Sequence, residues 1–486
     1  MRAVTCRLAL TVAAAALAGC ALAPPPKPDE IRSQAAPNVA PPPAWTGAAT
    51  AAGSVADNWL AGFGDPQLDA LVREALLYNA DLGIAAARVE QAAAYAKLAG
   101  SALYPAVNLL GKGGSKSGGD GTGVNIGGLF ATWELDVWGR VRSEREAGRL
   151  QYGSALADAE FARQSIAAMV ARSWLLAIEA RLQGAIAADV VRASEQATGL
   201  AQDRQRVGRG DEYDVALAQS NLETARDAAR QIALGQEQAR RALETLVGRY
   251  PAAAVEVAAA LPSAPGGVPA GLPSELLERR PDVIAAERRV AAAFYRVSEA
   301  KAARLPRLSL TANISSLSSD TFVLQDRNNP VGSFGANLTA PIFSGYALQA
   351  QVEIRTAEQQ LAVAEYGRIA QRAFGEVEGA LSAGLAADER AAILSRAVAS
   401  NARSLELAQV RYKVGSGDLR AVLQQNIALY GGRSAELRML SERLIQRVNL
   451  HLALGGSFEP RPGETTQGGI DDAAIRFVAT RSPPKN

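Results

Sequence analysis

Few side chains in this 486-residue chain are placed to do acid–base or metal chemistry. His451 is the only histidine, and the leucines on both sides of it indicate helix packing rather than catalysis. Glu134 and Asp136 flank a predicted strand-to-helix passage, and we interpret them as structural rather than as a glycosidase pair. The spacings typical of zinc sites, phosphate loops or activated serines do not occur. The sequence therefore predicts a protein that is not an enzyme and uses no metal or cofactor.

Polar residues with a clearer functional potential gather in two copies of a V-G-x-G-D segment. Val207 to Asp211 forms what we name the first tip, and Val414 to Asp418 forms the second tip. Glycine can take the left-handed conformation that ends a helix, and aspartate can cap the helix that follows. We therefore expect each tip to join two antiparallel helices. The candidate site residues are Val207, Gly208, Arg209, Gly210, Asp211, Glu212, Asp214, Val414, Gly415, Ser416, Gly417, Asp418 and Arg420.

The N-terminus carries the signals of a lipoprotein. Two arginines precede an apolar run from Leu8 to Leu17, which is too short to span a bilayer as a helix. Small residues then lead to Cys20, so residues 1–19 are a predicted signal peptide and the Cys20 thiol is the predicted site of a covalent lipid. Ala21, where aspartate favours retention at the inner membrane, points to the outer membrane. The alternative is an ordinary signal peptide with a chance cysteine.

Charge and hydropathy restrict the partners of the chain. Its formal net charge is +2, and loss of the two leader arginines brings the mature chain to about 0, which gives no reason to expect nucleic acid. No segment after the leader has the roughly 18 consecutive apolar residues of a membrane helix. A chain of this kind could cross a membrane only with strands.

Residues 21–44 are rich in proline and alanine, which predicts an extended tether. The sequence between this tether and a polar tail is duplicated. A shift of 201 residues aligns Asp81 with Asp282 and Pro105 with Pro306, and a shift of 207 aligns the two tips. The predicted domains are the leader, a lipid-anchored tether (20–58), a first repeat (59–250), an equatorial connector (251–281), a second repeat (282–456) and a tail (457–486).

Each half has the same predicted elements. A helix of middling length is followed by two strands, a very long helix, a tip and a returning helix. The long helices contain good helix formers, and 66 residues of helix measure about 100 Å. Asn79 is a predicted N-cap, and Pro281 suits a first helical turn. The predicted helices are 81–103, 141–206, 212–247, 282–304, 345–413 and 419–453, and the predicted strands are 106–112, 124–137, 307–316 and 332–342.

Four strands are too few to close a membrane sheet. Lipid tolerates no unpaired strand edge, and small single-chain barrels need about eight strands. Several copies of the chain must therefore complete one barrel. Aromatic residues cluster near the strand ends, where an interfacial belt would lie: Phe130, Trp133, Trp138, Phe334, Phe343 and Tyr346. The alternative is a periplasmic four-stranded sheet covered by helices.

Three motifs resemble the outer-membrane factors of RND-type efflux systems. Trp133 to Arg140 reads W-E-L-D-V-W-G-R, Val268 to Asp282 reads V-P-A-G-L-P-S-E-L-L-E-R-R-P-D, and Asp65 to Leu68 reads D-P-Q-L. The resemblance covers roughly residues 55 to 456 and is strongest to the lipidated NodT/OprM-like branch, more distantly to TolC. It implies a homotrimer with a 12-stranded outer-membrane barrel, a periplasmic tunnel of long helices and a mixed equatorial region.

The resemblance also implies partners and a mechanism. The chain would be a passive exit duct for small molecules, docked to a periplasmic adaptor and an inner-membrane RND-type pump. We expect the tips both to close the resting duct and to dock the adaptor; that Asp211 and Asp418 are only N-caps is left open. Many members of that family carry a carboxylate in a V-L-D or L-L-D segment after the second tip. This chain has Val422, Leu423 and Gln424 there, which weakens the case for a cation-sensitive ring. A standalone diffusion channel and a periplasmic scaffold lipoprotein are the alternative functions.

Overall fold

The computed structural model divides into two compact units. It describes residues 25–38, 42–47, 53, 55, 57–112, 124–319 and 331–459. Unit 1 is made of residues 1–39, 87–158 and 282–369, and unit 2 of residues 40–86, 159–281 and 370–486. Each unit thus draws on both halves of the duplication. The predicted leader, Cys20 and nearly all of the tail lie outside the described residues.

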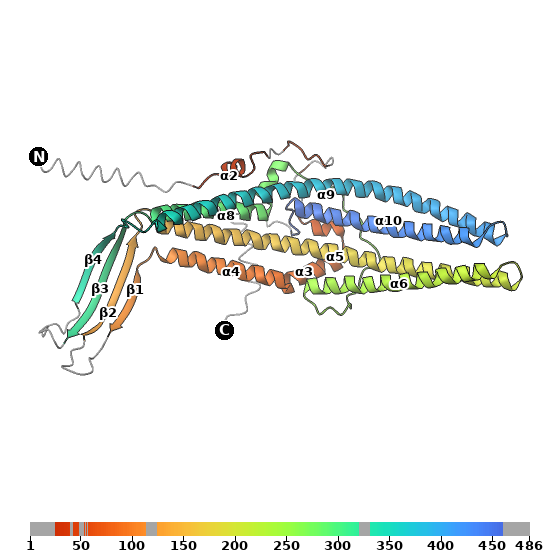
Figure 1. Ribbon diagram of the computed structural model, residues 1–486, viewed down its shortest axis with the longest axis horizontal. Coiled ribbons are helices and arrows are strands. Elements are labelled where there is room, and N and C mark those ends of the chain that lie inside the picture. The colour runs from red at the N-terminus through yellow and green to blue at the C-terminus, as the bar shows by residue number, and fades with distance from the viewer. Residues whose placement is uncertain are drawn as a thin grey trace. The chain divides into compact units, whose positions relative to one another are not determined.

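Unit 1 contains one antiparallel four-stranded sheet (Figure 1). Its order is β1-β2-β3-β4, so neighbours in the chain are neighbours in the sheet. Phe130 of β2 pairs with Asn108 of β1 and with Asn313 of β3, and Ser333 of β4 pairs with Asn313 in turn. β1 and β4 are the two edges. The bounds are Ala106–Lys112, Val124–Leu135, Arg307–Ser319 and Val331–Thr339 for β1 to β4.

The register sorts the side chains of the sheet onto two different faces. Successive strand residues point to opposite faces, so paired residues share a face. One face is apolar and includes Val107, Leu109, Leu129, Trp133, Leu310, Ile314, Phe334 and Leu338. The other is mainly polar and includes Asn108, Thr132, Glu134, Ser309, Thr311, Asn313, Ser333 and Asn337. Leu109 is 80% exposed and Phe334 is 94% exposed, so the described residues leave much of the apolar face uncovered.

Long helices account for most of the remaining described chain. Two hairpins, α5–α6 and α9–α10, turn at the two tips in unit 2 (Figure 1). The helices are α3 (Pro66–Tyr78), α4 (Ala80–Ser101), α5 (Arg140–Arg206), α6 (Glu212–Val247), α7 (Leu276–Arg279), α8 (Pro281–Ala302), α9 (Ala347–Lys413) and α10 (Leu419–Ala453), with 3-10 turns η1 (Trp59–Phe63) and η2 (Pro273–Glu275). None of the helices in the described ranges is both long and apolar enough to cross a membrane.

The core of unit 2 surrounds Trp174 of α5, which is fully buried. The Trp174 indole Nε1 donates a hydrogen bond to Asp65 Oδ2 at 2.7 Å. Asp65 Oδ1 accepts from the backbone N–H groups of Gln67 and Leu68 and so caps α3. The D-P-Q-L motif therefore joins a helix cap to the core.

Most predicted elements agree with the structure, and the differences lie at their ends. Asn79 Oδ1 accepts from the N–H groups of Asp81 and Leu82, and α8 begins at Pro281, which confirms both predicted helix starts. β2 and β4 end two and three residues earlier than predicted, and β3 continues to Ser319. The described tether is not simply extended, because Pro28–Ala35 forms a helix, α2, in unit 1.

Candidate functional site

The first tip is a helix ending built on two glycines. Gly208 has a φ of +72°, and the N–H of Arg209 donates to the carbonyl oxygen of Arg204 at 2.8 Å, which closes the last turn of α5. A Cβ at Gly210 would lie 3.1 Å from the Cβ of Arg204, closer than side chains normally pack. The first glycine is therefore required by its positive φ and the second by close packing.

The second tip repeats this construction. Gly415 has a φ of +84°, and the N–H of Ser416 donates to the carbonyl oxygen of Arg411 at 3.0 Å. A Cβ at Gly417 would lie 3.0 Å from the Cβ of Arg411. The duplication seen in the sequence is thus a duplication of backbone geometry, and Ser416 takes the place of Arg209.

The aspartates of both tips cap the returning helices. Asp211 Oδ1 accepts from the N–H of Asp214 at 2.9 Å, and Asp418 Oδ1 accepts from the N–H of Ala421 at 2.7 Å. A cap of this kind contributes about 1 kcal/mol to stability. The capping function is therefore confirmed, and it leaves the outer carboxylate oxygens and the neighbouring Glu212 on the surface.

Two arginine–tyrosine contacts link the hairpins to each other. Arg204 donates to the backbone carbonyl oxygen of Tyr412 at 2.7 Å, and its guanidinium lies 4.3 Å from the centre of the Tyr412 ring. Arg420 donates to the Tyr213 hydroxyl at 2.8 Å. Tyr412 is buried, whereas Tyr213 is 56% exposed. The first link is therefore partly shielded from water, whereas the second is exposed.

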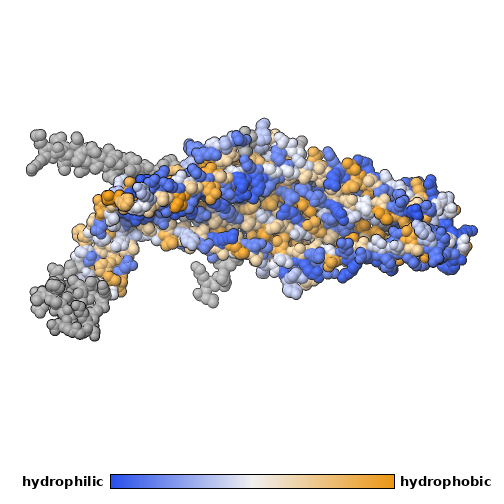
Figure 2. All heavy atoms as spheres, viewed as in Figure 1, coloured by the Kyte–Doolittle hydropathy of each residue, from blue (hydrophilic) through white to orange (hydrophobic). Residues whose placement is uncertain are grey.

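The electrostatics at the tips centre on Asp214. Burial, and then repulsion from the carboxylates of Asp211 and Asp418, raise the pKa of Asp214, while Arg204 opposes the rise. Burial also raises the pKa of Tyr412. Figure 2 shows mainly hydrophilic residues over the ends of the hairpins. The charged form of Asp214 is therefore disfavoured at the tips.

The structure brings the predicted tip residues together and adds three that the sequence argument missed. Val207 and Val414 are 67% and 73% exposed at the ends of the hairpins. Arg204, Tyr213 and Tyr412 make the links between the tips, and none of them was predicted. Their helical spacing gave no signal, although Arg204 lies in the aligned part of the repeat.

Buried apolar residues hold the two hairpins together beneath the tips. Ala201 of α5 and Leu419 of α10 are almost completely buried in one cluster with Tyr412. Partly buried residues of α6, among them Val215 and Leu217, pack against it. The links between the tips therefore lie at the end of a packed seam rather than on isolated loops.

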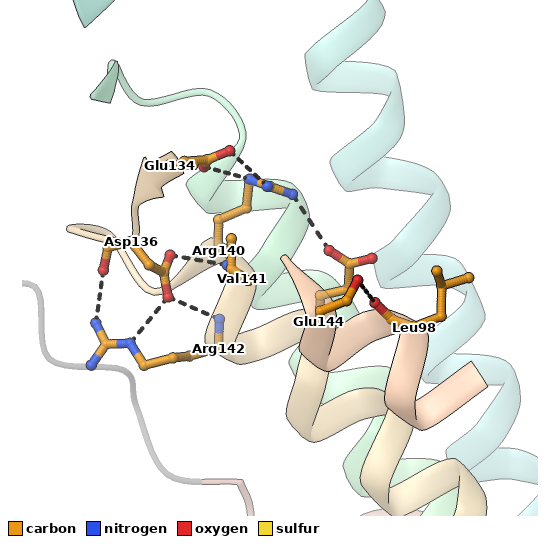
Figure 3. A network of polar contacts seen from close by, with 8 residues as sticks. Leu98, Glu134, Asp136, Arg140, Val141, Arg142 and Glu144 are labelled. Carbon is orange, nitrogen blue, oxygen red and sulfur yellow. Dashed lines mark hydrogen bonds and ion pairs between the residues drawn. The ribbon is translucent and has the colours of Figure 1, made fainter. Parts of the chain in front are cut away.

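Glu134 and Asp136 hold the passage from β2 to α5 (Figure 3). Both oxygens of Glu134 accept from Arg140, at 3.0 and 2.9 Å. Asp136 accepts from the backbone N–H groups of Val141 and Arg142, at 2.9 Å each, and so caps α5. The geometry agrees with a structural function for both carboxylates, as predicted.

His451 is buried against an aromatic ring. Its imidazole stacks on Trp59 with ring centres 5.7 Å apart and planes 15° apart, and it is 6% exposed. Burial, and then the charge of Arg447, lower the pKa of His451 to about 4. This environment agrees with the predicted packing function. Within the described ranges, no three His, Cys, Asp or Glu side chains form a group that could hold a metal ion.

Known proteins are similar to this chain in both sequence and fold. The family described as "Outer membrane efflux protein" matches residues 71–249 and 272–456. The chain is 33% identical to the pyoverdine export outer membrane protein OpmQ of Pseudomonas aeruginosa over 425 residues, which are 82% of this chain and 87% of OpmQ. It is 31% identical to the cation efflux system protein CusC of Escherichia coli K12 over 93% of this chain and 99% of CusC.

A solved structure gives the same result. The open state of the Neisseria gonorrhoeae MtrE outer membrane channel superposes with a TM-score of 0.77 at 28% sequence identity, over 87% of this chain and 96% of MtrE. The fold is therefore that of the TolC-like channels, as expected from the motifs. The chain belongs to the outer membrane efflux protein family, whose members are channels of the outer membrane and not enzymes.

Proposed function

We propose that this chain is the exit duct of a tripartite efflux pump, passively conducting small molecules from the periplasm to the exterior. The observation that carries the proposal is the two-faced sheet of unit 1. Its apolar face is exposed and suits lipid, while its opposite face carries hydroxyl and amide side chains that suit water. A sheet of a water-soluble domain would instead bury its apolar face.

The functional unit in this proposal is a homotrimer. Among the described strands, β1 and β4 have a neighbour on one side only, and an unpaired strand edge is not tolerated in hydrocarbon. Pairing β4 of one protomer with β1 of the next would satisfy both edges, and three copies would give a closed 12-stranded barrel. Exposed apolar residues of α9, such as Ile393 and Leu407, would then be covered between protomers.

The tips would form the periplasmic mouth of the duct. Links between hairpins in each protomer, such as Arg204 to Tyr412, favour the closed arrangement. A periplasmic adaptor that binds the tips in a spread arrangement would shift the equilibrium to the open state, since a ligand favours the state it binds more tightly. An inner-membrane RND-type pump would supply the energy. Relatives named after antibiotic and cation efflux agree with such an assembly.

The anchor would be a covalent lipid on Cys20. The apolar run, the small residues before Cys20 and the absence of Asp at position 21 support an outer-membrane lipoprotein. The body would then extend from the outer membrane into the periplasm. No cofactor other than this lipid enters the proposal.

Conductance of the purified protein tests the proposal. We expect a heat-labile trimer in detergent that gives a small, mostly closed conductance in planar bilayers, with opening when its periplasmic adaptor is added. A large constant conductance without the adaptor would instead support a standalone diffusion channel. A water-soluble monomer after removal of the lipid would support a periplasmic scaffold lipoprotein and overturn the proposal.

A further inference from the structure

We infer that Phe130 forms a stacking site for planar aromatic molecules on the polar face of the sheet, with the amide side chains of Asn108 and Asn313 on either side of it. The inference rests on the proposed function, because this face lines the duct only if the sheet is part of a closed barrel. It adds to that function a residue that favours cargo of one chemical class.

Phe130 lies on the mainly polar face of the sheet. It pairs with Asn108 of β1 and with Asn313 of β3. Ser333 of β4 completes the row by pairing with Asn313. Directly paired residues share a face, so these four side chains form one row across the sheet. Among the strands β1 to β4 as the structure describes them, Phe130 is the only aromatic residue on this face.

The sequence predicted a different position for Phe130, in an interfacial belt with Trp133 and Phe334. The register shows that this prediction is wrong for Phe130, because Trp133 and Phe334 lie on the opposite, apolar face. Phe130 also lies near the middle of β2, which runs Val124–Leu135, whereas belt aromatics lie near the ends of strands. Contact with lipid therefore does not account for this side chain.

The backbone beside Phe130 leaves room for a flat molecule. Phe130 is half-buried, so part of its ring is accessible. Gly128 lies on the same face two residues earlier and has no side chain that could cover the ring. A Cβ at Gly128 would overlap the backbone carbonyl oxygen of Ile314, so a larger residue does not fit there. The close approach of β3 thus keeps the surface next to the ring free of a side chain.

The amides on both sides of Phe130 add hydrogen-bonding groups. An asparagine side chain carries two N–H donors and a carbonyl acceptor. Ser315 Oγ donates to Asn313 Oδ1 at 3.5 Å, a long bond in which the N–H groups of Asn313 take no part. Directly paired residues have Cβ atoms about 5 Å apart. One small planar molecule can therefore stack on the ring of Phe130 and also bond to the amide of Asn108 or Asn313.

These groups together favour planar aromatic molecules with polar substituents. Aromatic rings attract each other in offset-stacked arrangements, and a positive charge is attracted to the face of a ring. Polar substituents of such a molecule would bond to the amides, since a bound molecule displaces water from them. Saturated molecules of the same size lack the flat surface that stacking requires.

A trimer would carry three such sites at one level of the barrel. The interior of an eight-stranded barrel is filled by its own side chains, and a barrel of 12 strands is wider. The three rings would therefore lie along the wall without closing the duct. Stacking on a single ring is weak, which suits a duct, because cargo must bind well enough to enter and weakly enough to leave.

Binding of ethidium, a planar aromatic cation, tests the inference. Ethidium is titrated with the purified trimer in phosphatidylcholine nanodiscs and followed by fluorescence anisotropy, with empty nanodiscs as the blank. Phe130→Ala should weaken binding by about three- to tenfold, whereas Phe130→Trp should bind at least as tightly as the unsubstituted protein. The matched control is Phe334→Ala, on the apolar face of the same sheet, which should leave the affinity unchanged.

Phe130→Leu separates stacking from apolar packing. Leucine keeps a large apolar side chain beside Gly128 but has no ring, so it should weaken the binding of ethidium nearly as much as alanine does. This variant and Phe130→Trp test the inference even if Phe130→Ala does not assemble. Unchanged affinity in Phe130→Leu, or an equal loss in Phe334→Ala, would overturn the inference.

Cysteine labelling distinguishes a failure of this inference from a failure of the proposed function. In nanodiscs, Phe130→Cys should react with a charged, membrane-impermeant maleimide and Phe334→Cys should not, with the unsubstituted protein as the background. Labelling at position 130 combined with equal ethidium affinities in all variants would overturn the stacking site alone. If position 130 is not labelled, the polar face does not line a water-filled duct, and both proposals are overturned.

Discussion

Arg204 and Tyr412 lie 208 positions apart in the chain, and in the structure the arginine guanidinium both bonds to the backbone of the tyrosine and covers its ring. The tyrosine is buried and the hydrogen bond is partly buried, so water competes with this contact less than with an exposed one. It joins the two hairpins of one protomer at the end that we propose to be the mouth of the duct.

Removal of the Arg204 side chain should open the duct. Arg204→Ala loses a charge-assisted hydrogen bond and a cation–π contact, together about 1–2 kcal/mol per protomer. The open fraction in planar bilayers should therefore rise at least about tenfold. Arg206→Ala is the control, because Arg206 pairs only with Asp203 on its own helix in the contacts described. Unchanged gating in Arg204→Ala would show that the link does not hold the mouth closed.

The contact between Arg420 and Tyr213 should contribute less to gating than the contact between Arg204 and Tyr412. Tyr213→Phe removes only the hydroxyl that accepts from Arg420, and this contact is exposed to water. We expect a loss below about 1 kcal/mol and a small increase in open time. An effect as large as that of Arg204→Ala would contradict the expectation that the more buried contact contributes more.

Acidification should favour the closed tips. Because the folded pKa of Asp214 is raised, protonation of this group stabilises the arrangement as the pH falls, and the stabilisation is lost as the pH rises through that pKa. Conductance should therefore decrease on acidification, before ordinary aspartates titrate. Asp214→Asn should be less conductive at neutral pH and lose this pH dependence, while Glu212→Gln should retain it.

His451 should make the fold sensitive to acid. Its folded pKa of about 4 lies below the ordinary value of 6.5, so the unfolded state takes up the proton first. Stability should fall as the pH drops from about 6.5 to 4, by up to about 3 kcal/mol. His451→Phe can keep the stacking on Trp59 without titrating, so the difference between the two unfolding curves isolates the histidine. Parallel curves over this pH range would contradict the assignment.

Asp136 should stabilise the start of α5. Asp136→Ala removes the acceptor of two backbone N–H groups, and we expect a loss of about 1–2 kcal/mol per protomer, seen as a lower unfolding temperature. Glu146→Ala breaks the more exposed pair with Arg149 and should change stability by less than about 0.5 kcal/mol. Equal shifts in both variants would show that the cap contributes nothing specific.

Local patterns in the sequence predicted most of the fold. Apolar and polar residues alternate from Leu308 to Ser315, which predicts a strand. Good helix formers predict the long helices, and the glycines of both tips predict the turns. Each of these signals comes from residues that are close together in the chain, and their backbone preferences determine the local structure directly. The aspartate caps were predicted for the same reason.

Contacts between distant residues could not be predicted in this way. The position of Tyr412 under Arg204 depends on how two hairpins pack, and the packing of α2 depends on Gly367 of α9, more than 300 residues later. Proline- and alanine-rich composition indicated only extended chain around α2. Composition reflects the average conformational preference of a segment. The close packing of α2 on α9 instead requires that residue 367 has no side chain.

The V-G-x-G-D segments leave little freedom for variation. One glycine is fixed by its positive φ, the other by close packing, and the aspartate by its cap. The residue between the glycines escapes all three constraints, and it is Arg209 in one copy and Ser416 in the other. The two turns thus share one scaffold and differ only at the residue between their glycines, so an exchange of arginine and serine at this position should leave both turns intact.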